Sequence, residues 1–250
     1  MGSFLVFAFL FFIGCTLGWT LELVYRRFSP ENKSHRWINP GFLTGPYLPL
    51  YGFGLCILYS LAECERFIHT DSLALRRIAI ILIMAAALTL IEYIAGVIFV
   101  RGMHVKLWDY SNRKFNIQGI ICPLFSFFWG VLAAVYYIFV HRHIMSALEW
   151  FSRNLAFSFV IGMFFGVFVI DVFYSFGIVV KIKKFADENR VLVRYEEFKE
   201  HIQTEMRQKK EKYRFIFALH TSRPITEHLR SYVEKQRSKL SELTKKEKNI

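Results

Sequence analysis

Charged residues are scarce through most of this 250-residue chain. Charged residues make up 21% of the sequence, and most of them follow Lys181, whereas the stretch from Met1 to Val180 is mostly apolar. Hydrophobic residues reach 54% and aromatic residues 18%, above the usual apolar share of a soluble domain. The first 180 residues are therefore not expected to form an ordinary soluble domain, and their long apolar runs indicate membrane spans.

Several motifs of nucleotide binding and catalysis are also missing. The sequence contains no Walker A, GxGxxG, GxSxG or HExxH pattern. ATP hydrolysis by a recognised motif is therefore excluded, and a pump that contained this chain would need a separate ATPase subunit. His141 and His143 are two positions apart, so a helix points them to different faces and no metal site is predicted. No cofactor is expected.

The four cysteines do not form a disulfide framework. None belongs to a CxxC pair, and three of them lie inside apolar segments. Free cysteine packs as a small apolar residue in such segments. We interpret all four as packing residues: Cys15, Cys56, Cys64 and Cys122.

Five apolar segments predict an all-α membrane helix bundle of about five spans. They are Phe4–Tyr25, Tyr47–Leu61, Arg77–Val100, Gly119–Val140 and Leu155–Val180. No basic residue precedes the first segment, which favours a retained span over a signal peptide. The second segment is short and begins among prolines and glycines, so it either spans or forms a broken, re-entrant helix buried in protein.

The basic residues of the loops predict the orientation. Four Lys/Arg lie in each of the loops Arg26–Thr44 and Arg101–Gln118, and two in each of Glu63–Arg76 and His141–Asn154. Basic loops stay in the cytoplasm. If the second segment crosses, the N-terminus lies outside, and the chain is a multi-pass protein of the cell membrane with a cytoplasmic C-terminal tail.

We divide the chain into a transmembrane bundle, residues 1–180, and a basic helical tail, residues 181–250. The tail holds 19 Lys/Arg and 11 Asp/Glu. This excess serves as a topological signal or attracts anionic lipids, and the interleaved acids argue against nucleic acid as a partner. Apolar residues recur at helical spacing at Val191, Tyr195, Phe198, Ile202 and Met206, and again at Ile225, Leu229, Tyr232, Gln236, Leu240 and Leu243. These stripes must pack on each other, on a second copy, on the membrane surface or on a partner.

Carboxylates within spans are costly and indicate function by default. Three occur, and the predicted topology places all of them toward the cytoplasmic leaflet, where both inner loops begin. We therefore predict a polar pocket between helices, formed by Glu22, Asn39, Glu92, Trp108, Asp109, Tyr110, Ser111, Asn116 and Asp171. Each residue also has a structural interpretation: Glu22 could pair with Arg26, Glu92 could clamp a neighbouring helix, and the aromatic residues could form an interfacial belt.

A set of short motifs between Leu17 and Val131 carries a family resemblance. The motifs are Gly18-Trp19 with Glu22, Asn39-Pro40-Gly41-Phe42-Leu43-Thr44-Gly45-Pro46 with Pro49, Tyr51 and Gly52, Glu92-Tyr93 with Gly96, Trp108-Asp109-Tyr110-Ser111 with Asn116 and Gly119, and Ser126 with Trp129-Gly130. In these the chain resembles the bacterial membrane proteins described as "putative ABC-transporter type IV", and the related animal transmembrane protein 229 group. It departs from their usual pattern at Pro40, where relatives carry Arg, and at Val100, where they carry a second Glu.

The resemblance implies a transport-associated protein, permease-like or an accessory subunit lacking its own ATPase. The expected partners are membrane lipids, a separate ATPase subunit and, through the tail, a second copy of the chain. Two alternatives stay open. One is a lipid-binding protein or lipid-modifying enzyme that uses Glu22, Glu92 and Asp109 at the inner leaflet. The other is a structural membrane scaffold.

Overall fold

The computed structural model describes residues 2–29, 32, 35–70, 72–208, 219, 221 and 223–248, with side chains up to residue 242. The described chain is helical apart from loops and one short sheet. Its main helices are α1 (Ser3–Phe28), α2 (Pro49–Glu63), α3 (Leu73–Val97), α4 (Pro123–Val135), α5 (His141–Arg153), α6 (Ser158–Asn189), α7 (Tyr195–Gln208) and α8 (Ile225–Lys248). Short helical turns follow α2 (Cys64–Phe67) and precede α6 (Leu155–Phe157), and π-helical segments follow α3 (Ile98–Gly102) and α4 (Tyr136–Val140).

Four continuous helical stretches of the described chain are long and apolar enough to cross a membrane. They are Ser3–Phe28, Leu73–Gly102, Pro123–Arg153 and Leu155–Asn189. The predicted membrane helix bundle is thereby confirmed. Helix α2 has 15 residues and a length of about 22 Å, less than the roughly 20 residues that a full crossing needs. Pro49 begins it, since proline is tolerated in the first helical turn.

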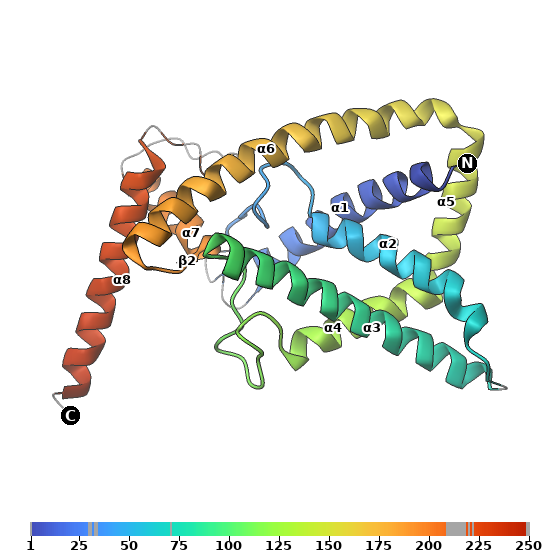
Figure 1. The fold of residues 1–250 in the computed structure, drawn as a ribbon, viewed down its shortest axis with the longest axis horizontal. Helices are drawn as coiled ribbons and strands as arrows, with labels where there is room; N and C mark the ends of the chain where they lie inside the picture. Colours follow the sequence, from blue (N-terminus) through green and yellow to red (C-terminus); the bar gives the residue numbers. More distant parts are fainter. Residues whose placement is uncertain are drawn as a thin grey trace.

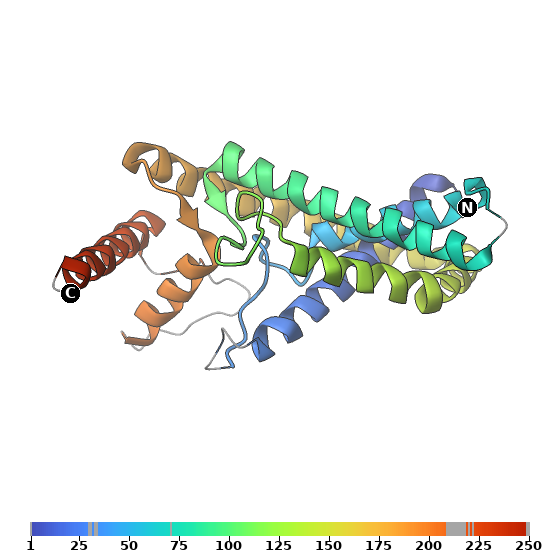
Figure 2. The same cartoon turned by 90° about the horizontal axis from the view of Figure 1, so that it is seen from below.

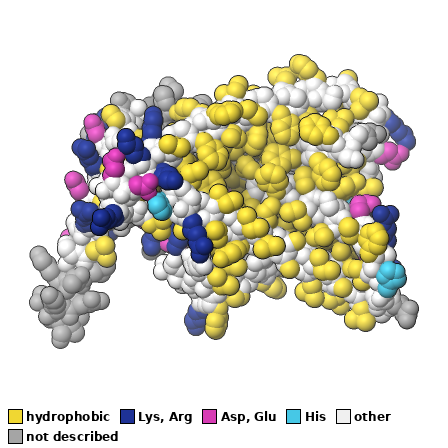
Figure 3. Space-filling model, viewed as in Figure 1, with side chains coloured by type: hydrophobic (Ala, Val, Ile, Leu, Met, Phe, Trp, Pro, Cys, Tyr) yellow, Lys and Arg dark blue, Asp and Glu magenta, His cyan; other side chains and the backbone are white. Residues whose placement is uncertain are grey.

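Helices α1, α2, α3, α4 and α6 run side by side along the long axis of the molecule (Figure 1). The N-terminus, the α2–α3 connection and α5 lie at one end. The 35–48 and 103–122 loops and the described C-terminal elements lie toward the other end, which we call the cap end. On the face shown in Figure 3, charged side chains gather toward the ends and hydrophobic ones cover the middle. A bilayer would surround this apolar belt.

The prediction that His141–Asn154 forms a loop is wrong, because most of this segment forms helix α5. Helix α4 continues through the π-helical segment into α5, which crosses the end of the bundle (Figure 1). Ile144, Leu148 and Phe151 are buried on one side of α5, and Trp150 is half exposed on the other. The apolar run stops at Val140, but the 3- and 4-residue spacing of these apolar side chains signals an amphipathic helix.

The described parts of the tail are mainly helical, as predicted, and they pack against the bundle. Helix α6 continues to Asn189, beyond the expected Val180, and Arg190 ends it in the left-handed conformation (φ 51°). Strand β2 (Val193–Arg194) then pairs in parallel with β1 (Val105–Lys106). We call the following part, α7 and α8, the cap; it lies beyond the end of α3 rather than alongside the bundle (Figure 2).

An apolar cluster joins the cap to the bundle. The stripe predicted on α7 is buried at Tyr195, Phe198, Ile202 and Met206, and that of α8 at Leu229 and Tyr232. These side chains pack with Val105 from β1 and with Val179 and Ile182 from α6. The tail stripes therefore pack on each other and on the bundle. Leu240 is exposed, and the side chain of Leu243 lies outside the described residues.

Candidate functional site

The segment between α1 and α2 returns into the bundle without helical structure. Asn39, Leu43, Tyr47 and Leu48 are all buried, and the backbone N–H of Leu48 donates to the carbonyl of Cys15 in α1 (3.0 Å). Non-helical backbone is tolerated at membrane depth only where protein satisfies its polar groups. The segment 35–48 meets this requirement, and it is why α2 starts part-way along the bundle.

Asp171 in α6 fastens this segment. Its carboxylate accepts hydrogen bonds from the backbone N–H groups of Thr44 (3.1 Å) and Gly45 (2.7 Å). It also accepts from the hydroxyls of Thr44 (2.6 Å), Tyr47 (2.7 Å) and Ser175 (2.8 Å). Five donors, none of them charged, surround one carboxylate. Asp171 is therefore an anchor that joins α6 to the re-entrant backbone.

Glu92 in α3 has a much smaller set of donors. It is 3% exposed, and its two oxygens each accept one hydrogen bond, from the Tyr110 hydroxyl (3.1 Å) and from the Trp129 indole N–H (2.8 Å). Phe125 stacks on the Tyr110 ring, with centroids 4.2 Å apart. Glu92 thereby joins α3, α4 and the 103–122 loop.

Glu22 in α1 lies next to this group. Arg26 donates to one of its oxygens (2.8 Å), so the expected pair is present, and the Tyr51 hydroxyl donates to the other (3.0 Å). The Tyr51 ring also contacts Trp129, with centroids 5.4 Å apart. A Cβ at Gly18 would lie 2.2 Å from the Tyr51 side chain. The glycine is therefore needed for Tyr51 to lie across α1 and reach Glu22.

Arg26 continues the connection into the cap. Its guanidinium contacts Glu196 of α7 at 2.8 Å, and Glu196 contacts Lys199 at 3.0 Å. The Lys199 ammonium, on a side chain buried to 3% exposure, donates to the carbonyls of Asn39 (2.7 Å) and Gly41 (3.0 Å). Burial lowers the pKa of Lys199, against the attraction of Glu196.

A connected set of residues thus runs from α3 to the cap, through side chains and, at Asn39, through the backbone carbonyl. We call it the polar chain, and its members are Glu92, Trp129, Tyr51, Glu22, Arg26, Glu196, Lys199 and Asn39. The Asn39 side chain accepts from the indole of Trp19 (2.6 Å) and donates to the carbonyls of Leu43 and Thr44. The 35–48 segment is therefore bound by Lys199 of α7 and by Asp171 of α6.

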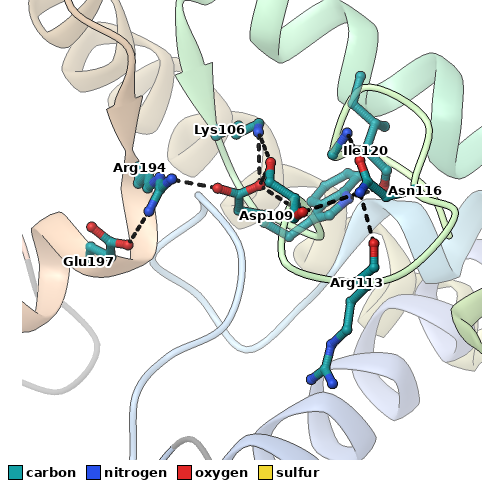
Figure 4. Close-up of polar contacts among 10 residues, drawn as sticks. Lys106, Asp109, Arg113, Asn116, Ile120, Arg194 and Glu197 are labelled. Atoms are coloured by element: carbon teal, nitrogen blue, oxygen red, sulfur yellow. Dashed lines mark hydrogen bonds and ion pairs between the residues drawn. The ribbon is translucent and has the colours of Figure 1, made fainter.

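Asp109 centres a second cluster at the cap end (Figure 4). It accepts from Lys106 (2.8 Å) and from both the hydroxyl and the N–H of Ser111, and it contacts Arg194 of β2 at 3.1 Å. Burial alone would raise the pKa of Asp109, but the hydrogen bonds from Lys106 and Ser111 hold it below its usual value. Arg194 also contacts Glu197 of α7 (2.9 Å). This cluster fixes the β1–β2 pairing.

Two further candidates hold the loop itself. The Trp108 indole donates to the Ile120 carbonyl (2.8 Å), and the Asn116 side chain donates to backbone carbonyls within the loop and accepts from the N–H of Gly119 (2.9 Å). Gly119 has φ +67°, and a Cβ there would lie 2.4 Å from the Ser111 hydroxyl oxygen. These contacts are structural.

Comparison with known proteins identifies the family. A family model described as "Putative ABC-transporter type IV" matches residues 9–176. The chain belongs to this family. No curated protein and no solved structure gives a significant match. The matched region contains every candidate residue predicted from the sequence, and it ends before the cap. The family match therefore gives no information about the cap, whose position is known from its contacts in the structure.

The structure distributes the predicted site residues over separate groups. Glu22, Glu92, Tyr110 and Asn39 join the polar chain or contact it, whereas Asp109 with Ser111 forms the second cluster and Asp171 forms the anchor. A small cavity of about 20 Å³ lies beside Asn39, Thr44 and Lys199, and a larger, mostly apolar groove of about 410 Å³ lies between α3 and α4. A single polar pocket shared by all nine residues stays a prediction. Among the described residues, no group of three or more His, Cys, Asp and Glu could hold a metal ion.

Sequence reasoning missed several functional contacts. Tyr51 and Trp129 belong to the family motifs but were not expected to contact the acids. Glu196 and Lys199 carried no signal, because the tail contains many charged residues at similar spacing. Lys199 is buried by the packing of α7 on the 35–48 segment, and Glu196 is brought between Arg26 and Lys199 by the same packing.

Proposed function

We propose that the protein is a permease-like or accessory transport subunit of the cell membrane that works with a separate ATPase. In this proposal the cap faces the cytoplasm and contacts the ATPase, and the polar chain links the cap to the spans. The supporting observation is the Arg26–Glu196 contact, which joins a side chain of α1 to one of α7. A shift of α7 would act directly on the Glu22–Tyr51–Trp129 contacts.

The orientation is supported by the grouping of basic segments. The loops with four Lys/Arg each and the tail, with its net positive charge, lie at the same end of the bundle (Figure 1). The positive-inside rule assigns this end to the cytoplasm. An ATPase that supplies energy to the complex would also be cytoplasmic.

Helix α8 provides the proposed contact surface for the ATPase. Its first half packs on α7 through Leu229 and Tyr232, whereas every residue from Arg237 to Glu242 is exposed, with Leu240 at 63%. A stretch of helix whose side chains are all exposed adds little apolar packing to the fold. An interface with another protein would give this half a role.

Native mass spectrometry of the complete chain, extracted from its own membrane in mild detergent, tests the proposal. We expect a stoichiometric nucleotide-hydrolysing subunit to co-purify. The double variant Lys239→Glu/Leu240→Glu should lose it, and Arg142→Glu, an exposed change at the opposite end, should keep it. Extraction without any such subunit, or its retention by the α8 variant, would overturn the proposal.

A further inference from the structure

The charges around Glu92 do not balance if Glu92 is ionised. In the polar chain, Glu22 pairs with Arg26, and Glu196 pairs with Arg26 and Lys199. Two carboxylates and two cations therefore neutralise each other without Glu92. An ionised Glu92 would place one uncompensated negative charge on a side chain that is itself buried, which is costly in a low-dielectric environment.

Among the described residues, the elements packed around Glu92 present no cation that pairs with it. Helix α4 presents the neutral Trp129, the 103–122 loop presents Tyr110, and α2 presents Tyr51 behind the Trp129 ring. Helix α1 presents Glu22, which is close enough to repel a second negative charge. Arg26 of α1 is already shared by two carboxylates, and Arg27 of α1 lies against the His35 carbonyl and the Trp37 ring.

The hydrogen-bond partners of Glu92 can accommodate a bound proton. The Trp129 indole can only donate, so it requires an acceptor oxygen, which a neutral acid offers as its carbonyl oxygen and a carboxylate as either oxygen. The Tyr110 hydroxyl, 3.1 Å from the other oxygen, can donate or accept. By rotating, it accepts from the acid when the proton is bound and donates to the carboxylate when it is released.

We propose that Glu92 is a proton-binding site of the membrane bundle and that it is occupied at neutral pH. Trp129 is its fixed partner, which always donates, and Tyr110 is its adaptable partner, which can donate or accept. The ligand is a single proton, bound to the Glu92 oxygen that faces Tyr110. The site does not depend on the proposed ATPase partner. Its occupancy is set by the charge of Glu22 and Arg26, and through Arg26 by the position of the cap.

Infrared spectroscopy of the complete chain in lipid vesicles tests the site, because a protonated carboxyl has its own C=O stretching band. At about pH 7, well above the usual glutamate pKa of about 4.3, we expect one such band. It should be lost in Glu92→Gln at every pH. Glu149→Gln removes an exposed carboxylate of α5 and should leave the band unchanged.

Glu22→Gln tests the charge balance itself. Removal of Glu22 leaves Arg26 one carboxylate short, so Glu92 should ionise and take over that charge. The band should weaken at neutral pH and return on acidification, in contrast to its permanent loss in Glu92→Gln. Tyr110→Phe, which keeps the carboxyl and removes the adaptable partner, should shift the band and leave it present.

Two results would overturn the proposal. One is a neutral-pH carboxyl band that survives in Glu92→Gln. The other is a chain whose carboxyl bands appear only below about pH 5, the range of ordinary glutamates. If Glu92→Gln fails to fold, the Glu22→Gln and Tyr110→Phe spectra still decide: a spectrum unchanged in both would exclude a proton on Glu92.

Discussion

Asp171 and Glu92 are both buried acids within the spans, yet their surroundings differ. Asp171 accepts five hydrogen bonds, two of them from backbone N–H groups. Glu92 accepts two, both from side chains, and lies near a second acid. Several donors directed at one carboxylate can stabilise its charge without a cation. The number of donors therefore separates an anchor from a site that can change its protonation.

The two acids also differ in what depends on them. The donors of Asp171 include the backbone N–H groups of Thr44 and Gly45 in the 35–48 segment. The donors of Glu92 belong to side chains of elements that already pack through apolar contacts. Loss of Asp171 should therefore damage the fold, and loss of Glu92 should change its electrostatics.

The largest effect is expected for Asp171→Ala. It leaves the N–H groups of Thr44 and Gly45 without an acceptor inside the bundle, at about 1–3 kcal/mol for each unsatisfied group. The free energy of unfolding should fall by about 3–5 kcal/mol, measured by thermal or steric-trap unfolding in detergent. Ser175→Ala, which removes a single donor, should cost about 1 kcal/mol. If Asp171→Ala and Glu92→Gln lowered the free energy of unfolding equally, the proposed difference between the two acids would be wrong.

Lys199→Met should have the next largest effect, because it removes the hydrogen bonds that join α7 to the 35–48 segment. The carbonyls of Asn39 and Gly41 and the Glu196 carboxylate lose their donor. Hydrogen bonds of a charged group are worth about 1.5–3 kcal/mol. Hydrogen exchange in residues 35–48 should accelerate, while Lys184→Met, an exposed change on α6, should leave it unchanged. Acceleration by both variants would argue against a specific role of Lys199.

Gly18→Ala is expected to disturb the contacts near Glu92. Its Cβ would lie 2.2 Å from the Tyr51 side chain, so Tyr51 must move away from Glu22 and Trp129. Overpacking of this kind costs about 1–3 kcal/mol. Trp fluorescence and thermal unfolding should both change. Gly162→Ala is the matched control, since a Cβ there meets nothing within 4 Å, and alanine should stabilise that helix slightly.

The spans could be predicted from the sequence because lipid imposes a simple rule of length and polarity. The same rule explains the errors. Helix α5 crosses the end of the bundle and is only half apolar, so a search for apolar runs ended at Val140. Whether the second segment spans or is re-entrant stays a prediction. The non-helical course of the chain before α2 depends on Asp171, a residue more than 120 positions away along the chain.

The candidate site was predictable only in part. An acid within a span is visible in any sequence, so Glu22, Glu92 and Asp171 could be selected. Their different roles depend on how many donors surround each one, which is a property of packing. The contact of Arg26 with Glu196 joins residues 170 positions apart and had no local signal.

The smallest expected effect concerns Asp109, an acid with cations beside it and therefore a third case next to Asp171 and Glu92. Hydrogen bonds from Lys106 and Ser111 hold its pKa below that of the unfolded chain, despite the opposing effect of burial. The stabilisation is therefore present above about pH 4 and is lost as the pH falls through the folded-state pKa. At neutral pH Asp109→Asn should lower the melting temperature by about 2–4 °C, for about 1 kcal/mol. The difference between Asp109→Asn and the unchanged protein should shrink as both are acidified. A constant difference from neutral to acidic pH would mean that Asp109 acts through its shape and hydrogen bonds rather than through its charge.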